Sequence, residues 1–186
     1  MMNMASKLFN AADRQQIPIT IADPELPDCP LVYANGAFEK LTRYSSQDIS
    51  GQNCRFLQGD DTDVDVVARL GNAIRLGEAH TCCLLNYRGN GEPFHNLLFV
   101  DSITVEPDRN YVVGCQFEVT KLVTQPGIAA QVANTWCAVT DLNLERTYRE
   151  TVQMRREILQ TKAETAIVMI RDYLMRTKLS GYALGI

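Results

Sequence analysis

The stretch that decides the fold lies near residue 55 and consists of Gly51-Gln52-Asn53-Cys54-Arg55-Phe56-Leu57-Gln58-Gly59. Its first part, Gly51–Leu57, is predicted to form a tight helical turn that joins longer elements. It sets the thiol of Cys54 beside a guanidinium and three carboxamides. The elements before and after this turn define the fold class.

The elements before the turn are short. Residues 1–16 alternate apolar and polar groups and predict a short amphipathic helix. Strands are predicted at Ile17–Ala22 and Leu31–Ala34, on either side of a segment rich in turn-forming residues. Two short helices follow, one capped by Asn35 and one over Ser45–Ile49, capped by Ser45 or Ser46.

A longer helix and three longer strands are predicted after the turn. The helix begins at Thr62, and its apolar residues recur at helical spacing as far as Ile74. The strands are His80–Arg88, Pro93–Asp101 and Tyr111–Phe117, with good hairpin connections between them. This order predicts an α+β fold, a five-stranded antiparallel sheet with short helices on one face.

The remaining residues, 121–186, follow a different sequence pattern, which predicts two helices, Ile128–Val139 and Leu144–Thr177. In the second helix an apolar stripe, interrupted only by Arg155, needs a partner surface. The stripe consists of Tyr148, Val152, Leu159, Ala163, Ile167, Ile170 and Leu174. We therefore expect three regions: an N-terminal helical cap (1–16), a central domain (17–120) and a C-terminal helical extension (121–186).

The bulk composition excludes several classes of protein. The 186 residues are 46% apolar and carry a net charge of −4, which gives no general case for nucleic acid or membrane binding. The six cysteines follow no zinc-ligand spacing. No apolar run approaches the roughly 20 residues that span a bilayer, and residues 1–10 lack a signal peptide's apolar stretch. We expect a soluble, reduced, cytoplasmic protein without a metal site.

The stretch 51–59 closely resembles the signature of light-oxygen-voltage (LOV) domains, a family of PAS-type sensors. Further matches to that family occur in the same order along the chain, and the resemblance covers roughly residues 17–118. These matches are Asp23-Pro24, Leu26-Pro27-Asp28, Asn86-Tyr87, Asn96-Leu97 and Gly114-Cys115-Gln116. The resemblance implies a PAS-like fold, a bound flavin, usually FMN, and the function of a blue-light photoreceptor.

The resemblance also implies a role for particular residues. Cys54 takes the place of the thiol that adds reversibly to the flavin C4a carbon under blue light. Asn86 and Asn96 would hydrogen-bond the pyrimidine edge of the ring, since an amide both donates and accepts. Gln116 would sense protonation of flavin N5. The other expected flavin contacts are Asn53, Arg55, Leu57, Gln58, Leu98 and Val100, of which Arg55 and Gln58 would face the phosphate.

The sequence departs from the family pattern at the phosphate. A second arginine is common on the helix that begins at Thr62, at a site where this chain has Gly71. Weaker FMN retention, or tolerance of FAD, is the expected consequence. Two smaller departures are His95, where an aromatic residue is frequent, and Leu98, where phenylalanine is frequent.

The signalling output is less defined by the sequence. The apolar stripe after residue 144 predicts a homodimer whose packing or association changes with light, and an unknown protein partner. No phosphoacceptor histidine occurs in residues 121–186, so we expect no enzyme activity. The alternatives are a flavin redox sensor without an adduct, a flavoenzyme, and a colourless PAS interaction module. A DNA reader, suggested by Arg155, Arg156 and Arg171, is disfavoured because these charges suit a solvated helix face.

Overall fold

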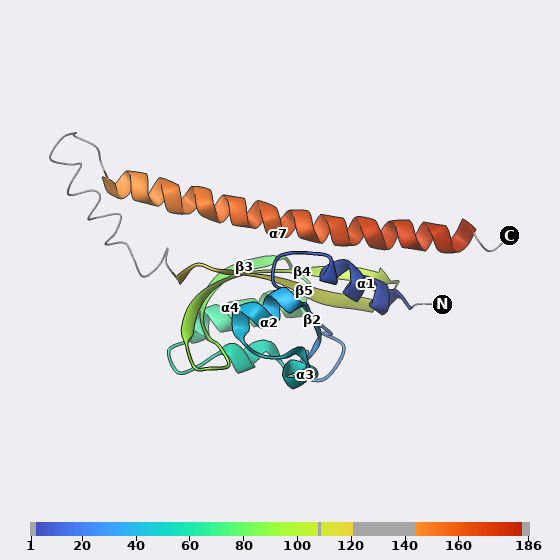
Figure 1. The fold of residues 1–186 in the computed structure, drawn as a ribbon, viewed down its shortest axis with the longest axis horizontal. Helices are drawn as coiled ribbons and strands as arrows, with labels where there is room; N and C mark the ends of the chain where they lie inside the picture. Colours follow the sequence, from blue (N-terminus) through green and yellow to red (C-terminus); the bar gives the residue numbers. More distant parts are fainter. Residues whose placement is uncertain (1–2, 108, 121–143, 184–186) are drawn as a thin grey trace.

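The computed structural model describes residues 3–107, 109–120 and 144–183 (Figure 1). The predicted helix Ile128–Val139 lies outside these residues, and so do the side chains of Tyr148, Val152 and Arg155 in the predicted stripe.

A five-stranded antiparallel sheet forms the centre of the molecule, in the order β2-β1-β5-β4-β3. This confirms the predicted fold class, with boundaries close to those expected. The strands are β1 (Ile19–Ala22), β2 (Leu31–Ala34), β3 (His80–Tyr87), β4 (Pro93–Glu106) and β5 (Arg109–Glu118).

Strand β4 is longer than predicted. The predicted strand ended at Asp101, but pairing continues from Asp101 opposite Val113 and Ser102 opposite Val112. The Asp101 carboxylate forms an ion pair of 2.8 Å with Arg171, which compensates a charge that would otherwise disfavour a covered sheet face. A polar residue therefore does not end the strand here.

Short helices cover one face of the sheet, which we call the inner face. Each begins at a side-chain cap: Asn35, Ser45, Asn53 or Asp63 accepts a hydrogen bond from a backbone N–H of the first turn. The helices are α2 (Gly36–Thr42), α3 (Ser46–Ile49), the 3-10 helix η1 (Cys54–Leu57) and α4 (Val64–Leu76).

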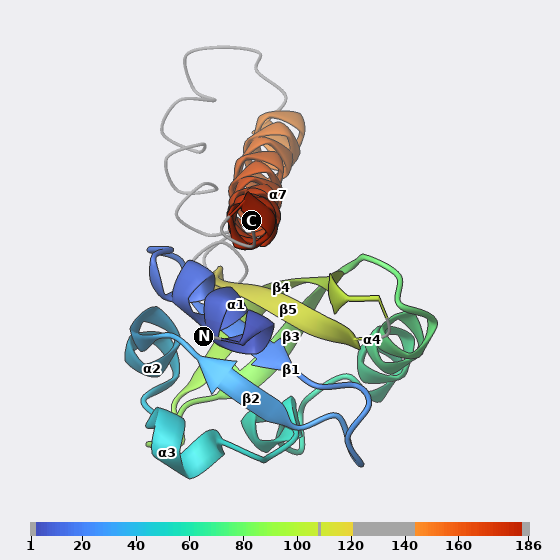
Figure 2. The ribbon, with the colours of Figure 1, turned by 90° about the vertical axis from the view of Figure 1, so that its right-hand side faces the viewer.

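Two further helices, α1 (Met4–Asp13) and α7 (Leu144–Ala183), pack on the opposite, outer face (Figures 1 and 2). The outer-face core joins residues of all three elements, including Leu8 of α1, Phe99 and Cys115 of the sheet, and Ala163 and Ile170 of α7. Buried positions of the predicted stripe, from Ala163 to Leu174, thus find their partner surface within the same chain.

Polar contacts hold α7 to the sheet and to α1. Arg171 also donates to the backbone carbonyl of Ser102 at 3.0 Å. The ammonium of Lys7 donates to the carbonyl of Thr177 at 3.1 Å, and the guanidinium of Arg14 lies 4.8 Å from the centre of the Tyr173 ring. The two outer helices therefore contact each other as well as the sheet.

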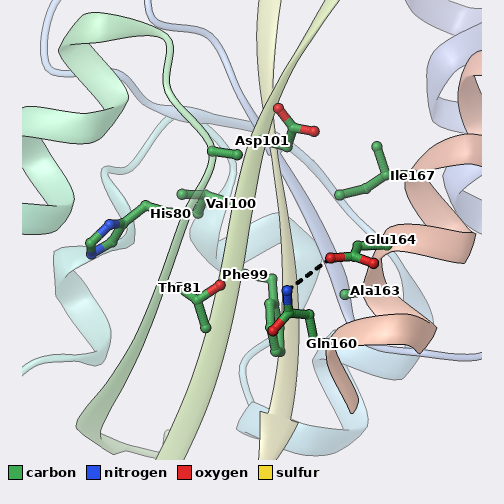
Figure 3. A pocket seen from close by; sticks show the side chains of 10 residues that line it. His80, Thr81, Phe99, Val100, Asp101, Gln160, Ala163, Glu164 and Ile167 are labelled. Carbon is green, nitrogen blue, oxygen red and sulfur yellow. Dashed lines mark hydrogen bonds between the residues drawn. The ribbon is translucent and has the colours of Figure 1, made fainter. Parts of the chain in front are cut away.

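The packing of α7 leaves a hollow of about 270 Å³ beside strands β3 and β4. Figure 3 shows Phe99 and Val100 on the strand side and Ala163 and Ile167 on the helix side. Gln160 and Glu164 of α7 are joined by a hydrogen bond of 2.9 Å at this hollow. The sheet and α7 thus meet through small and aliphatic side chains, without filling all the space between them.

Candidate functional site

A cavity of about 480 Å³ lies between the inner face of the sheet and the segments that carry η1 and α4. Its volume falls within the roughly 300–1,000 Å³ typical of small-molecule sites. Its wall includes nine of the ten predicted site residues. They are Asn53, Cys54, Arg55, Leu57, Gln58, Asn86, Asn96, Leu98 and Gln116. Residues separated by more than sixty positions in the sequence are thereby brought to one pocket.

Cys54 is the first residue of η1, directly after its cap. The Asn53 carboxamide accepts from the backbone N–H of Arg55 at 3.0 Å and so fixes the start of this turn. Burial raises the pKa of the Cys54 thiol to about 12, and the nearby Cys29 contributes in the same direction. The sulfur therefore carries its proton at neutral pH, on the wall of the cavity.

Three carboxamides line the sheet side of the cavity, and each is almost completely buried. Asn96 Nδ2 donates to Asn86 Oδ1 at 3.0 Å, while Asn96 Oδ1 has no partner. Gln116 Nε2 donates to Thr20 Oγ1 at 3.0 Å, while Gln116 Oε1 has no partner. A buried acceptor without a partner costs about 1–3 kcal/mol. Two such acceptors aimed at one cavity fit a ligand that has hydrogen-bond donors on its edge.

Thr20 and Gly114 support Gln116. Sequence reasoning missed Thr20 and used Gly114 only as part of a family match, without a role. Thr20 of β1 lies opposite Gly114 of β5 in the antiparallel register. A Cβ at position 114 would lie 2.8 Å from Thr20 Oγ1 and 3.0 Å from Gln116 Nε2, so only glycine leaves room for their hydrogen bond. A glycine inside a strand often marks such a close approach, and this was the available signal.

Two arginines lie at the mouth of the cavity. Arg55 makes a two-pronged ion pair with Asp28, with N···O distances of 2.5 and 2.7 Å, which lowers the pKa of that carboxyl. Arg75 of α4 also lines the cavity, one helical turn after Gly71, and donates to Asn72 Oδ1 at 3.2 Å. The sequence prediction named Arg55 and Gly71 but missed Arg75, whose i+4 spacing from Gly71 places it on the same helix face.

Two residues lie elsewhere than expected. Val100 is absent from the cavity wall; it packs beside it with Leu84 and Val112 and borders the hollow of Figure 3. His95 belongs to the alternate set of β4 residues, which faces away from the cavity, and its backbone N–H donates to Thr120 Oγ1 at 2.9 Å. His95 therefore does not line the cavity in which a ring would bind.

Other classes of site find no support in the described ranges. Across residues 3–107, 109–120 and 144–183, no group of three histidine, cysteine or acidic side chains gathers as a metal site would require. No helix in these same ranges has the length and apolar character needed to cross a membrane.

Comparisons with known proteins agree with the geometry of the cavity. A family model for the PAS domain matches residues 18–121. The blue-light-activated histidine kinase 1 of Erythrobacter litoralis is 41% identical over 136 residues, which are 68% of this chain and 38% of the kinase. A blue-light photoreceptor of Listeria innocua is 38% identical over 113 residues, 61% of this chain and 45% of that protein. The chain thus spans less than half the length of either relative.

A solved structure covers more of the chain. The LOV protein of Rhodobacter sphaeroides superposes with a TM-score of 0.61 and 31% sequence identity, over 85% of this chain and 95% of that one. The match therefore extends beyond the sheet and its inner helices. The chain belongs to the light-oxygen-voltage family of PAS domains.

Proposed function

We propose that this chain is a blue-light photoreceptor in which Cys54 bonds reversibly to a flavin held in the cavity. FMN is the flavin that we expect first. The observation that carries the proposal is that a half-buried, protonated thiol and three buried carboxamides line one pocket. A bound flavin would supply a ring that, once excited by blue light, accepts sulfur at C4a and a proton at N5. The Cys54 side chain holds both the sulfur and the proton that this reaction consumes.

The carboxamides of the cavity suit the polar edge of such a ring. Asn96 Oδ1 is free to accept from a ring N–H, and Asn86 Nδ2, which now donates to its neighbour's carbonyl at 3.3 Å, can turn to a ring carbonyl. Leu57 and Leu98 supply apolar walls against the ring faces. This combination excludes water from the thiol while fixing the orientation of the ligand.

Gln116 is proposed as the residue that senses the proton at N5. Its carboxamide now donates to Thr20 through Nε2 and keeps Oε1 unpaired. When N5 gains a proton, Oε1 can accept from it, or the amide can rotate and exchange its partners. Because Thr20 can donate as well as accept, its hydroxyl accommodates either arrangement.

The path from Gln116 to the outer helices is short. Cys115, the next residue of β5, lies on the outer face opposite Ile19 and packs in the core that α1 and α7 share. We propose that a shift of β5 alters the packing of residues 1–16 and 121–186, and with it the association of two copies of the chain. Output would then pass to another protein, without catalysis by this chain.

The cellular setting follows from the chemistry. Cys29, Cys54, Cys82, Cys83 and Cys115 are all free thiols, and the reversible reaction proposed for Cys54 requires its own thiol to stay reduced. We therefore place the protein in the cytoplasm.

The decisive experiment is an absorption spectrum of the purified, flavin-bound protein before and after blue light. We expect the blue flavin band to bleach and to recover in darkness. Cys54→Ala should bind flavin and lose the bleaching, whereas Cys83→Ala, which removes an exposed thiol on β3, should behave as the parent does. Unchanged bleaching in Cys54→Ala would overturn the proposal in favour of a flavin redox sensor.

A further inference from the structure

The cavity contains a second thiol besides that of Cys54. Cys29 lines the same pocket and is partly exposed, in the segment that closes the mouth. The other described cysteines lie elsewhere: Cys115 in the outer-face core, Cys82 and Cys83 on β3. Among the described thiols, only Cys29 shares the cavity with Cys54.

Backbone hydrogen bonds set the two cysteine segments side by side. Leu31 N–H donates to the carbonyl of Gln52, and Gly51 N–H donates to the carbonyl of Leu31, both at 2.8 Å. These bonds run the segment before Leu31 antiparallel to the segment after Gln52. The segment that carries Cys29 therefore lies alongside the segment that carries Cys54.

Side-chain bonds continue this pairing beyond the backbone bonds. Asn53 Nδ2 donates to the carbonyl of Asp28 at 2.5 Å and to that of Cys29 at 3.5 Å. The Arg55 guanidinium forms an ion pair with the Asp28 carboxylate. Both neighbours of Cys54 are thus tied to the dipeptide that carries Cys29. Cys29 and Cys54 thus lie on neighbouring segments and line one cavity, and a disulfide requires their Cα atoms to come within roughly 4.4–6.8 Å of each other.

The backbone at Cys29 is also held in place. Asp28 and Cys29 both adopt positive φ angles, 70° and 47°, a conformation that non-glycine residues rarely take without support. The support comes from Cys29 N–H, which donates to the carbonyl of Leu26 at 3.1 Å, and from Asp23 N–H, which donates to that of Pro30 at 3.0 Å. The turn therefore presents Cys29 to the cavity in a defined orientation.

We propose that Cys29 and Cys54 form a reversible disulfide under oxidising conditions, and that this bond switches the light response off. With hydrogen peroxide as oxidant, one sulfur attacks the peroxide O–O bond to give a sulfenic acid and water. The second sulfur then displaces the hydroxyl group as a second water. The two thiols lose two electrons and two protons, and one peroxide becomes two waters.

The disulfide itself does not depend on the photochemistry, but its consequence rests on the proposed function. Cys54 Sγ bound to Cys29 has no proton or free valence to give to the flavin. Reduction of the disulfide by a dithiol would restore both. The chain would then respond to light only when the surrounding thiol pool is reduced.

The environment of the two thiols sets the rate of this reaction. Burial raises the pKa of both Cys29 and Cys54, and the carboxylates of Asp23 and Asp28 add to the effect at Cys29. Since the thiolate is the attacking species, oxidation should be slow at neutral pH and about tenfold faster per pH unit below those pKa values. A slow switch would report sustained oxidation and ignore brief pulses.

The test treats the flavin-bound protein in darkness with hydrogen peroxide and then follows two readouts. Mass spectrometry of unreduced peptides should find Cys29 linked to Cys54, with two thiols lost and both recovered after dithiothreitol. Bleaching by blue light should disappear and return in parallel. Oxidation without a Cys29–Cys54 link would overturn the proposal.

Two variants sharpen the test. In Cys29→Ser, whatever bleaching the reduced protein shows should survive the oxidant, whereas Cys83→Ser should lose it as the parent does. Loss of bleaching in oxidised Cys29→Ser would mean direct oxidation of Cys54 and would contradict the proposal. If the reduced parent never bleaches, the photoreceptor proposal fails, while the peptide link still decides the disulfide.

Discussion

At the scale of single residues, Gln116 stands between the cavity and the rest of the sheet. Its carboxamide is 1% exposed and is bonded to protein through one atom only. Gly114 leaves the space that this side chain needs, and Thr20 supplies its hydrogen-bond partner. A residue with one satisfied and one free end is suited to respond to a change in its ligand.

The first prediction is that Gln116→Leu separates light capture from response. Bleaching at Cys54 should persist, because leucine fills similar space without touching the thiol. The light-induced change in molecular shape, followed by X-ray scattering in dark and light, should be lost. Since Thr20 Oγ1 loses its donor, the free energy of unfolding should fall by about 1–3 kcal/mol.

The matched control is Thr20→Val, which removes the same hydrogen bond from the other side and keeps the Gln116 carboxamide. It should cost a similar stability yet retain the shape change. A full response in Gln116→Leu would exclude Gln116 as the sensing residue.

The second prediction concerns the phosphate of the ligand and also belongs to single residues. A Cβ at position 71 would meet nothing within 4 Å, so Gly71→Arg can place a cation at the cavity mouth. One charge-assisted pair of about 1.4 kcal/mol should make FMN bind about tenfold more tightly. The affinity for riboflavin, which lacks the phosphate, should not change. Arg75→Gln should weaken FMN and spare riboflavin.

Fluorescence titration of the flavin-free protein measures the affinities for FMN and for riboflavin, which are then compared between each variant and the parent. Arg69→Gln, on the same helix but outside the cavity wall, is the control and should change neither. Equal changes for FMN and riboflavin would argue against phosphate contacts at 71 and 75.

At the scale of elements, α7 contacts the sheet through small residues. Ala163 and Ala166 are buried at the contact, and the ion pair of Arg171 with Asp101 lies beside it. Small side chains let the helix approach the strands closely, so a modest displacement of β4 or β5 has to be passed to the helix. The hollow of Figure 3 gives the helix space to move on the side of β3.

The third prediction is that Ala166→Leu loosens α7 without affecting the cavity. Ala166 is 4% exposed and does not border the hollow of Figure 3, so the added carbon atoms cannot fit, and overpacking costs about 1–3 kcal/mol. Hydrogen exchange of α7 amides should rise while flavin stays bound and bleaches. Lys162→Leu adds a leucine at an exposed position of the same helix and should leave exchange unchanged. Protection of α7 equal to the parent would show that Ala166 does not hold it.

At the scale of the whole molecule, α7 has a second apolar set that the other described residues leave exposed. Ile158, Val168, Met169 and Met175 are exposed, by 50–59% of their surfaces. These residues are not part of the predicted stripe, whose buried positions from Ala163 to Leu174 pack within the chain, and they remain for another surface. A second copy of the chain is the partner we expect.

The fourth prediction is that Val168→Glu disrupts the dimer. Light scattering of the parent should give different average masses in darkness and in light, and a charge at an apolar interface disfavours association. Val168→Glu should be monomeric in both states, with bleaching intact, whereas Lys162→Glu should follow the parent. A parent that is monomeric in darkness and in light would refute the dimer.

Much of the fold was predictable because it depends on local pattern. Alternating apolar residues and turn segments located all five strands, and the caps at Asn35 and Ser45 located two short helices. The boundary error at Asp101 has a different origin. The Arg171 partner that compensates its charge comes from a helix seventy residues later, which no local pattern contains.

The sequence by itself determined the family, the five strands of an antiparallel sheet, and Cys54, Asn86, Asn96 and Gln116 as the residues of one site. It did so because the signature around Cys54 and the strand alternation are local features. Only the tertiary structure decided the order of the strands in the sheet, that Thr20 partners Gln116, that Arg75 lines the cavity and that Cys29 shares the cavity with Cys54. These contacts depend on strand register and helix docking, where a shift of one residue changes every partner.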